Sequence, residues 1–351
     1  MTTDAIYEQL AAALDRLPNG FPRTESGVEL RILEMIFSPE EAALAAQITG
    51  KWESLDEIAP RLEQPAESVS RQLFKLARRG MAWFDKRDGG AFFRLAPFIV
   101  GIYEAQIELM DHELSHLVEE YLTSGGAAGI MQPQPALHRV VPAQAALKSE
   151  QIMPYDDVRA VLLRAKSFSL NDCICRVQQD HMDRRCDFPL ATCLSFSERE
   201  RPMREGDISQ AEALALLDWC EETGLVHTVS NVMQGLGYVC NCCGCCCGIL
   251  RGINDFGIEK SVAYANYYAV IDADLCANCG TCRERCQVNA IIEGDGFSLV
   301  VQERCIGCGL CVTGCPNEVA RLVRKPEAEM VLPPVDFEAW EEARLQDRRM
   351  L

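Results

Sequence analysis

Residues 276–286 read CANCGTCRERC, and residues 305–316 read CIGCGLCVTGCP. Both stretches have the spacing C-x2-C-x2-C-x3-C, which is typical of proteins that bind two [4Fe–4S] clusters. In this arrangement three thiolates from one loop bind one cluster, and the fourth cysteine of the stretch binds the neighbouring cluster. Zinc is the alternative, but zinc sites favour two separated C-x2-C pairs over four closely spaced cysteines that occur twice.

The spacing divides these eight cysteines into two predicted ligand sets, because each fourth cysteine belongs to the other cluster. The cysteines predicted to hold one cluster are Cys276, Cys279, Cys282 and Cys315. Those predicted to hold the second are Cys305, Cys308, Cys311 and Cys286. Two [4Fe–4S] clusters are therefore the expected cofactors of this part of the chain.

Residues 266–325 resemble the bacterial two-cluster ferredoxins. The resemblance rests on NYYAVIDADLCANCGTCRERC at 266–286 and on AIIEGDGFSLVVQERCIGCGLCVTGCP at 290–316, which includes a predicted hairpin at Gly294–Gly296. It implies a ferredoxin-like domain that transfers electrons. One position departs from the family, because Gln287 stands where the family usually has proline. We interpret this residue as drift at the start of a helix.

The whole chain has 351 residues, enough for two or three domains, and its 19 cysteines are far more than usual. Disulfide bonds are the alternative use of so many cysteines. The opening MTTDAIYEQLAAALDRL, however, predicts an amphipathic helix rather than a secretory signal. No stretch is long and apolar enough to predict a transmembrane helix. We therefore expect a cytoplasmic protein of an anaerobic or low-oxygen cell, with its thiolates committed to metal.

The formal net charge of −18 indicates which partners suit the chain. A negative field of this size repels phosphate backbones and anionic lipids, and it favours redox partner proteins that carry basic surfaces. It also opposes the addition of an electron to a cluster, so we expect low reduction potentials.

Residues 25–123 predict a winged-helix-like domain followed by a long helix. Helices are expected at PEEAALAAQIT (39–49), SLDEIAPRL (54–62) and PAESVSRQLFKLARRG (65–80), and a two-stranded wing is expected at MAWFDKRDGGAFFRLAP (81–97), with its tip at Asp88–Gly90. Ser54 and Glu57 form a predicted capping box at the second helix. The long helix is expected at 98–123.

A winged helix raises the question of DNA binding. Basic residues lie along the candidate recognition helix and in the wing: Arg71, Lys75, Arg78, Arg79, Lys86 and Arg87. Residues 1–125, however, contain 12 Lys and Arg against 21 Asp and Glu, a net charge of −9. Because phosphate neutralisation contributes much of the affinity for DNA, we expect a protein-docking role and no nucleic-acid partner.

The predicted helix at 98–123 contains a formal H-E-x-x-H match at His112–His116, the pattern with which zinc proteases bind their metal. Glu119 and Glu120 are merely the next charges on the helix and supply no third-ligand signature. We therefore interpret this segment as an ordinary packing helix.

Residues 124–153 lack a helical period and contain several Gly and Pro, so we expect a linker. Residues 154–265 are predicted to form a cysteine-rich, mixed α/β middle domain with a further metal centre. Its candidate ligands form two sets: Cys173, Cys175, Cys186 and Cys193, and then Cys240, Cys242, Cys243, Cys245, Cys246 and Cys247. Cys220, in the helix predicted between them, is interpreted as a buried thiol.

Three arrangements of these ten cysteines are open. The first set can hold a further iron–sulfur cluster whose charge is offset by Arg176, Arg184 and Arg185. Adjacent cysteines point apart in extended backbone, so the second set binds with only some members or serves two centres. In the third arrangement the two sets combine around one unusual cluster. A zinc–thiolate site and a redox-active disulfide relay are the alternatives to an iron–sulfur cluster.

The whole chain resembles multidomain ferredoxin-like proteins of anaerobic bacteria and archaea, through C-x-C-R at 173–176, N-C-C-x-C-C at 241–246 and the C-terminal cysteines. We therefore expect an α+β multidomain fold. Its predicted parts are an N-terminal helix (1–24), the winged-helix-like part (25–123), the linker (124–153), the middle domain (154–265), the ferredoxin domain (266–325) and a tail helix (326–351).

The expected function is the transfer of electrons between redox partners, with the middle centre extending the route from the ferredoxin clusters. Arg283, Arg285 and Arg304 are expected to adjust the cluster potentials.

Two alternatives belong to other classes of protein. One is an iron–sulfur reductase with its active site at Cys240–Cys247 and with His227, Arg251 or His181 as proton donors. The other is a regulator in which the redox state of a cluster controls the winged helix.

Overall fold

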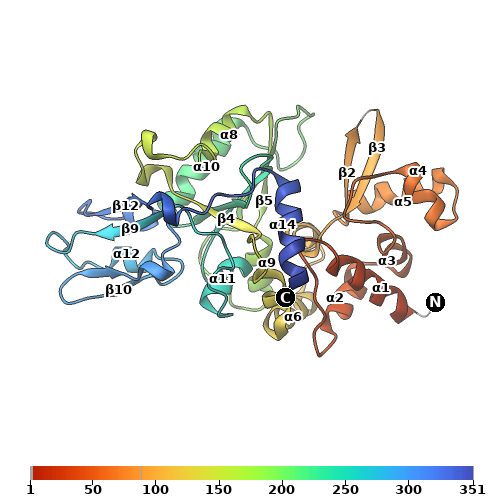
Figure 1. The fold of residues 1–351 in the computed structure, drawn as a ribbon, viewed down its shortest axis with the longest axis horizontal. Helices are drawn as coiled ribbons and strands as arrows, with labels where there is room; N and C mark the ends of the chain where they lie inside the picture. The colour runs from red at the N-terminus through yellow and green to blue at the C-terminus, as the bar shows by residue number, and fades with distance from the viewer. Residues whose placement is uncertain (1–2, 88, 351) are drawn as a thin grey trace. The chain divides into compact units, whose positions relative to one another are not determined.

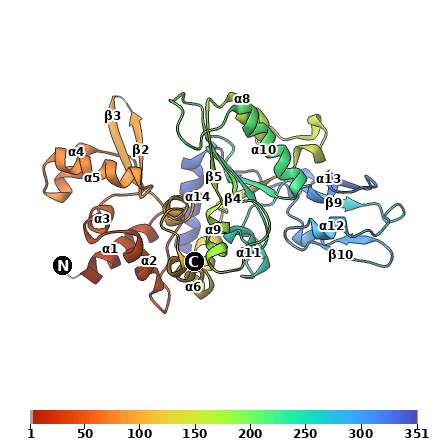
Figure 2. The ribbon, with the colours of Figure 1, turned by 180° about the vertical axis from the view of Figure 1, so that it is seen from behind.

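The computed structural model describes residues 3–87 and 89–350, and the chain divides into two compact units. The first unit comprises the residues up to 133 together with 177–184 and those from 344 onward, and the second comprises 134–176 and 185–343. Figures 1 and 2 show the chain from opposite sides. Every candidate metal-ligating cysteine belongs to the second unit.

Helices make up most of the first unit. They are α1 (Thr3–Asp15), α2 (Val28–Ile36), α3 (Pro39–Ala45), α4 (Leu55–Ile58), α5 (Ala66–Arg78), α6 (His112–Tyr121) and α7 (Ala127–Met131), with shorter turns of other helix types at Ala59–Leu62, Phe98–Ile102, Tyr103–Gln106 and Leu122–Gly126. Capping boxes begin two of these helices, because their first turns leave backbone N–H groups without helical partners. The capping box predicted at Ser54 and Glu57 is confirmed.

A small antiparallel sheet accompanies these helices, in the order β1 (Glu53–Ser54), β3 (Gly90–Leu95) and β2 (Ala82–Arg87). The rings of Phe74, Phe84 and Phe93 pack against one another with centroids 5.0 to 5.4 Å apart, which holds the β2–β3 hairpin on α5. The elements α3, α4, α5, β2 and β3 fall within the ranges predicted from the sequence, whereas α2 and β1 were not predicted. Asp88, at the tip of the predicted wing, lies outside the described residues.

The prediction of one long helix at 98–123 is wrong for the first half of that range. Val100 lies in the left-handed region at φ 62°, and its neighbours also have non-helical angles, so the backbone turns there. After a 3-10 turn at Tyr103–Gln106, the next α-helix begins at His112, where the side chain of Asp111 accepts a hydrogen bond of 2.9 Å from the N–H of Leu114. Asp111 is therefore an N-cap and not an interior helical position.

The segment 124–153, predicted to be a linker, contains regular structure. It includes α7 and the strand β4 (His138–Val141), which pairs antiparallel with β7 (Val226–Ser230). Because the partner strand lies far along the chain, the local residue pattern did not reveal β4.

A five-stranded antiparallel sheet forms the centre of the second unit, in the order β4-β7-β8-β6-β5. Its other strands are β5 (Ser167–Asp172), β6 (Ala191–Ser197) and β8 (Tyr238–Cys242). The helices α8 (Val158–Arg164) and α10 (Gln210–Thr223) bury Leu162 and Leu217 against Phe168 and Val239 of the sheet. Two more helices, α9 (Ile174–His181) and α11 (Gly248–Asn254), begin shortly after β5 and β8, so middle-part cysteines lie where strands lead into helices.

Residues 266–325 contain two short antiparallel ribbons. β9 (Tyr267–Ile271) pairs with β12 (Ala320–Arg324), and β10 (Ile291–Glu293) pairs with β11 (Ser298–Val300), which confirms the predicted hairpin at Gly294–Gly296. Two one-turn helices, α12 (Thr281–Glu284) and α13 (Leu310–Thr313), each start inside a cysteine loop. The β9–β12 pairing joins the beginning and the end of this part and so closes it into one body.

The C-terminal helix α14 (Phe337–Met350) lies within the predicted tail, and short 3-10 turns occur at Gln144–Ala146, Ser149–Gln151, Gln302–Arg304 and Glu327–Glu329. Within the first unit, Arg344 of α14 is fully buried and donates hydrogen bonds to the carbonyl oxygens of Pro18, Ile130 and Pro133. Over the described ranges 3–87 and 89–350, no helix combines the length and the apolar character needed to cross a membrane.

Candidate metal centres

Two cavities collect the eight C-terminal cysteines into sets of four. The Cys286 cavity is lined by Cys286, Cys305, Cys308 and Cys311. The Cys315 cavity is lined by Cys276, Cys279, Cys282 and Cys315. Each cavity therefore takes three cysteines from one loop and the fourth from the other, which is the grouping predicted from the spacing. Their role as cluster ligands stays a prediction.

Backbone N–H groups approach the sulfur atoms of the Cys286 cavity. The N–H of Ala290 lies 3.1 Å from Cys286 Sγ, and the N–H of Ala269 lies 3.4 Å from Cys305 Sγ. Gly307 has φ 73°, and a Cβ there would lie 2.4 Å from the carbonyl oxygen of Tyr267, so this loop position requires glycine. Four thiols with hydrogen bonds to their sulfurs are a donor set that fits a [4Fe–4S] cluster.

The two cavities differ in their exposure to solvent. Cys279 of the Cys315 cavity is exposed, and hydrogen bonds from Thr281 lower the pKa of its thiol. In the Cys286 cavity, Cys305 and Cys311 are buried, and burial raises the pKa of Cys308 to about 12. The Cys315 cavity is therefore the one with a ligand candidate at the surface.

The ten cysteines of the middle part fall into two groups that mix the two sets seen in the sequence. The four-thiol group consists of Cys186, Cys243, Cys245 and Cys246, whose sulfur atoms all lie within 4.8 Å of one another. The six-thiol chain consists of Cys173, Cys175, Cys247, Cys242, Cys240 and Cys193, in which each thiol interacts with the next in this order. The first sequence set therefore does not gather by itself: Cys186 joins one group, and its other members join the second.

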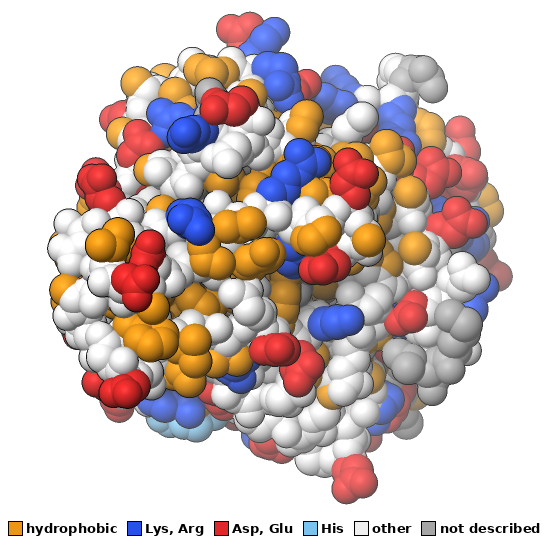
Figure 3. Space-filling view, turned by 60° about the vertical axis from the view of Figure 1, so that its left-hand side comes forward, with side chains coloured by type: hydrophobic (Ala, Val, Ile, Leu, Met, Phe, Trp, Pro, Cys, Tyr) orange, Lys and Arg blue, Asp and Glu red, His pale blue; other side chains and the backbone are white. Residues whose placement is uncertain are grey.

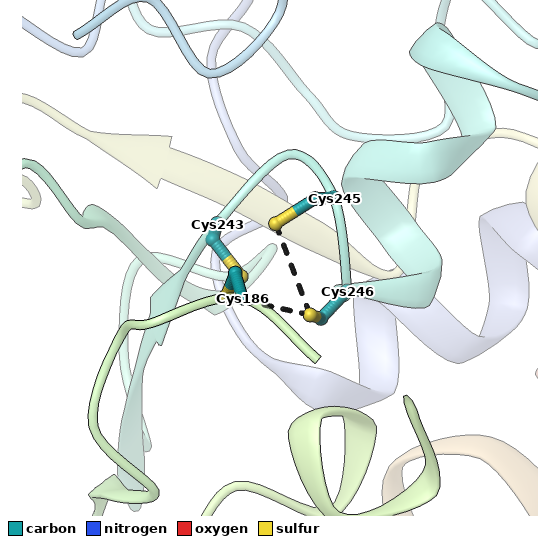
Figure 4. A group of neighbouring side chains, drawn as sticks. All are labelled: Cys186, Cys243, Cys245 and Cys246. Carbon is teal, nitrogen blue, oxygen red and sulfur yellow. Dashed lines mark hydrogen bonds between the residues drawn. The ribbon is translucent and has the colours of Figure 1, made fainter. Parts of the chain in front are cut away.

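Figure 4 shows the four-thiol group where two parts of the chain meet. Cys186 comes from the loop after α9, and the other three come from the turn between β8 and α11. The Sγ atom of Cys186 lies 3.7 Å from that of Cys243 and 3.5 Å from that of Cys246, and Cys245 lies 3.8 Å from Cys246. The adjacent residues Cys245 and Cys246 meet because the backbone turns there, whereas Cys242 and Cys243, at the end of β8, belong to different groups.

The thiols of the four-thiol group differ in how easily they ionise. Hydrogen bonds from Cys245 and Cys246 lower the pKa of Cys243, and the Arg176 guanidinium acts in the same direction. The hydrogen bond to Cys243 is also the main reason that the pKa of Cys245 is raised. Cys243 therefore ionises more readily than Cys245.

Arg176 is a buried positive charge beside both groups. Its side chain is fully buried. It donates hydrogen bonds to the carbonyl oxygens of Pro189 and Asn241, at 3.0 and 2.9 Å, and to Thr192 Oγ1, at 2.6 Å. Although burial opposes its charged form, the thiols of Cys173 and Cys243 raise the pKa of Arg176 above its usual value. Arg176 therefore lies beside the thiols of both groups, whereas Arg184 pairs with Glu119 in the first unit at 3.0 Å. That Arg176 offsets the charge of a bound cluster stays a prediction.

Gln287, which we interpreted as drift, connects the middle part to the ferredoxin-like part. Its Oε1 accepts a hydrogen bond of 2.8 Å from the N–H of Gly244, and its Nε2 donates one of 3.0 Å to the carbonyl oxygen of Gly224. A Cβ on residue 244 would lie 1.9 Å from the carbonyl oxygen of Gln287, so only glycine permits this approach. The residue after Cys286 is thus bonded to the residue after Cys243.

Replacing Gln287 by alanine should loosen this connection. Loss of the two hydrogen bonds is expected to cost about 1–2 kcal/mol locally, which speeds amide hydrogen exchange at Gly244 by about 5- to 30-fold. Exchange measured by mass spectrometry on peptides covering 238–250 tests this expectation. The control is Gln72→Ala, since Gln72 bonds only to side chains on the surface of α5 and its surroundings. Equal exchange in both variants would contradict a connecting role for Gln287.

The residues proposed as proton donors have structural contacts. His227 is buried, with Nδ1 2.6 Å from Asn241 Oδ1 and Nε2 3.3 Å from Glu221 Oε1. Arg251 is buried and pairs with Asp255 at 2.6 Å. His181 is exposed and belongs to the first unit, and Cys220 is fully buried as predicted.

The ferredoxin arginines bond mainly to oxygen atoms near the cysteine loops. Arg285 donates to the carbonyl oxygens of Glu221, Glu222 and Leu310 at 2.7 to 2.9 Å, and Arg304 donates to that of Val288 at 2.8 Å. Arg283 donates to Asn278 Oδ1 at 2.8 Å. These contacts hold the loops in place, and the effect of the arginines on cluster potentials stays a prediction.

The H-E-x-x-H match lies on α6 as a surface pair. The rings of His112 and His116 have centroids 4.2 Å apart, and His116 Nδ1 lies 2.8 Å from the carbonyl oxygen of His112. Within the part of the chain that the structure describes, no third ligand joins them in a metal-binding group.

A row of hydrogen bonds leads to the six-thiol chain, and it was not predicted from the sequence. Thr228 Oγ1 lies 3.5 Å from Cys242 Sγ and 3.3 Å from His138 Nδ1. His138 Nε2 lies 2.9 Å from the Tyr238 hydroxyl, to which Ser230 donates a bond of 2.8 Å. Burial lowers the pKa of His138 to about 4, so its ring is neutral at pH 7. The row runs across β4, β7 and β8, and only the pairing of these strands brings it together.

Comparison with known proteins agrees with the geometry of the C-terminal part. Residues 269–322 match the model of the 4Fe-4S dicluster domain family. The chain thus carries a 4Fe–4S dicluster ferredoxin domain at its C-terminal end, as predicted. No solved structure matches the chain.

Three curated relatives are proteins of electron transfer or ferredoxins. One subunit of the Na(+)-translocating ferredoxin:NAD(+) oxidoreductase complex of Acetobacterium woodii is 33% identical over 202 residues, which are 53% of this chain and 52% of that protein. An uncharacterized ferredoxin of Methanocaldococcus jannaschii is 35% identical over 77 residues (22% and 46%), and the electron transport protein HydN of Escherichia coli is 41% identical over 56 residues (15% and 32%). The chain spans about half or less of the length of these relatives. Together the domain and the relatives support an iron–sulfur electron-transfer function.

Proposed function

We propose that this protein passes low-potential electrons between redox partner proteins, through two [4Fe–4S] clusters and a further iron–sulfur cluster in the middle part. The observation that carries the proposal is the pair of four-cysteine cavities. The proposed ligands of the two clusters are the cysteines that line the Cys286 cavity and the Cys315 cavity. A [4Fe–4S] cluster bound there accepts and releases one electron at a time.

The surroundings of the two cavities support an order along the electron route. The Cys315 cavity has the exposed Cys279, so its cluster would exchange electrons with a docked partner. The Cys286 cavity is next to Gln287, which bonds to the turn that carries the middle cysteines. The cluster in the Cys286 cavity would therefore pass electrons between the Cys315 cavity and the middle part.

The six-thiol chain is the proposed site of the further cluster. Its thiols come from both sequence sets, and hydrogen bonds from Cys240 and Cys247 lower the pKa of Cys242, which favours its thiolate form. Arg176 supplies a buried positive charge beside it. Six thiols are more than one cube requires, so we propose that four of them bind.

Protein partners suit the surface better than nucleic acid. On the face shown in Figure 3, acidic and basic side chains are interspersed with hydrophobic ones. On α5 of the proposed winged helix, Lys75 lies 3.1 Å from Glu41, which also pairs with Arg79. These pairs reduce the positive charge that α5 offers to phosphates, which supports a docking role for this part.

The first test is the iron content and the redox activity of the full chain purified without oxygen. We expect about twelve iron and twelve acid-labile sulfide atoms per chain, and electron paramagnetic resonance signals of reduced clusters that appear at low potential. About eight of each would agree with the two ferredoxin clusters and would contradict the proposed cluster in the middle part. Fewer than eight, with no reducible signal, would contradict electron transfer through this domain.

Electron exchange with a basic partner should depend on salt. Because the chain carries a net charge of −18, the reduction of a basic cytochrome c is expected to slow by about 5-fold or more between about 10 mM and 300 mM salt. Stopped-flow kinetics measures this rate. A zwitterionic viologen is the control, since its rate should change little. A cytochrome rate independent of salt would contradict docking through negative charge.

A further inference from the structure

The sulfur atoms of the four-thiol group are separated by the distances expected around a single metal ion. A tetrahedral zinc ion with Zn–S bonds of about 2.3 Å places its four sulfurs about 3.8 Å apart. The distances among Cys186, Cys243, Cys245 and Cys246 include 3.5, 3.7 and 3.8 Å, and every remaining pair lies within 4.8 Å. One ion at the centre of this group would lie close to all four sulfurs, and small movements of the side chains would bring each of them to bonding distance.

A cube-shaped cluster requires a wider arrangement. Each of its four thiolates binds a different iron and points outward from its own corner, so the four sulfurs lie further apart than around one ion. Among the residues that the structure describes, neither ferredoxin quartet forms a group as close as the four-thiol group. The same structure thus separates two kinds of thiol site, one wide and one close.

Three of the four thiols in the four-thiol group are at least partly buried, whereas Cys245 is exposed. Cys243 and Cys246 are buried in an apolar cluster with Cys220 and Leu225, and Phe188 packs against this cluster. Four thiolates and a divalent ion carry a net charge of −2, and the buried Arg176 offsets part of it. Four protein ligands leave no position for a substrate, which distinguishes this site from a catalytic zinc site.

We propose that Cys186, Cys243, Cys245 and Cys246 bind one zinc ion in a tetrahedral site that is separate from the iron–sulfur clusters. The ion replaces the thiol protons, which leave to solvent, and it is neither oxidised nor reduced. It ties the loop after α9 to the turn between β8 and α11, and that turn contains Gly244, which bonds to Gln287. The site thereby fixes the turn that meets the Cys286 cavity, and it carries no electrons itself.

The test is the metal content of the full chain after anaerobic expression with both iron and zinc. We expect about one zinc per chain, measured by mass spectrometry of the metals. The variants Cys186→Ala and Cys246→Ala should lose this zinc while their iron and sulfide stay at the wild-type level. Cys220→Ala is the matched control, because its thiol lies in the same apolar cluster but outside the group. Cobalt(II) in place of zinc should show the visible bands of a tetrahedral thiolate site in the wild type and in Cys220→Ala only.

Four results would overturn the proposal. Loss of about four iron and four sulfide atoms in Cys186→Ala would assign the group to a cluster. Loss of one iron without sulfide would assign it to a single iron ion. Absence of zinc from the wild type, or zinc retained in both variants, would leave the group without the proposed ion. The zinc proposal rests on the zinc content and on the difference in iron between variant and wild type, whereas the electron-transfer proposal rests on the iron and the redox signals of the wild type. The failure of one proposal can therefore be distinguished from the failure of the other.

Discussion

Cys311→Ala is expected to lose one complete cluster, about four iron and four sulfide atoms per chain. Cys311 is buried and lines the Cys286 cavity, and the alanine side chain offers no ligand atom to replace its sulfur. The cluster in the Cys315 cavity should remain, because its four cysteines are untouched. Iron and sulfide analysis gives the count. Electron paramagnetic resonance of the reduced protein should show that the magnetic interaction between neighbouring clusters has disappeared.

A second variant keeps this prediction testable if one substitution merely unfolds the domain. Cys282 lines the Cys315 cavity. The variant Cys282→Ala should therefore lose the same amount of iron, while the cluster in the Cys286 cavity should remain. Cys220→Ala should keep the full content. Full iron in Cys311→Ala would exclude Cys311 as a ligand. Loss of all ferredoxin iron in both variants would show that the two sites cannot be filled independently.

Arg176→Met is expected to destabilise the second unit by about 3–5 kcal/mol. The substitution removes the buried positive charge beside the sulfur atoms of Cys173 and Cys243. It also removes hydrogen bonds to Thr192 and to two carbonyl oxygens. The midpoint temperature of thermal unfolding, measured by circular dichroism without oxygen, should fall by about 6–20 °C. The metal of the middle part should be lost with it.

The control for this variant is an arginine of the same unit with an exposed partner. Arg164 lies 3.8 Å from Glu198, and both side chains are more than half exposed (61% and 70%). Arg164→Met should therefore cost less than about 1 kcal/mol. Arg176→Lys retains the positive charge but not the planar guanidinium group. Its unfolding temperature should therefore lie between those of the two methionine variants. Equal transitions in Arg176→Met and Arg164→Met would contradict a role for Arg176 in charge compensation.

The ferredoxin cysteines were predictable because their arrangement depends on local spacing. Three ligands of each set lie within seven consecutive residues, and the exchange of Cys286 and Cys315 follows from the doubled pattern. The same holds for the cap at Ser54, whose backbone N–H donates a hydrogen bond to the side chain of Glu57, three residues later. Contacts of this kind do not depend on the rest of the fold.

The middle cysteines could not be grouped from the sequence, because their neighbours are set by tertiary structure. Cys186 joins residues about 60 positions later, and no spacing rule relates these segments. Gln287 was misread for the same reason, since its partners Gly244 and Gly224 precede it by many residues. The missed strand β4 and the turn at Val100 likewise follow from packing against distant segments or from a backbone angle that no residue pattern announces.

The crossed ligands of the two ferredoxin cavities have a consequence for how the protein is made. The ribosome releases the chain from its N-terminus, so all ten middle cysteines are available once residue 247 has emerged. Neither ferredoxin cavity is complete at that stage. The Cys286 cavity needs Cys311, and the Cys315 cavity needs Cys315 itself. The thiols of the middle part are therefore available for metal while the ferredoxin part is still being translated, whereas neither ferredoxin cavity has all four of its cysteines before Cys311 has been made.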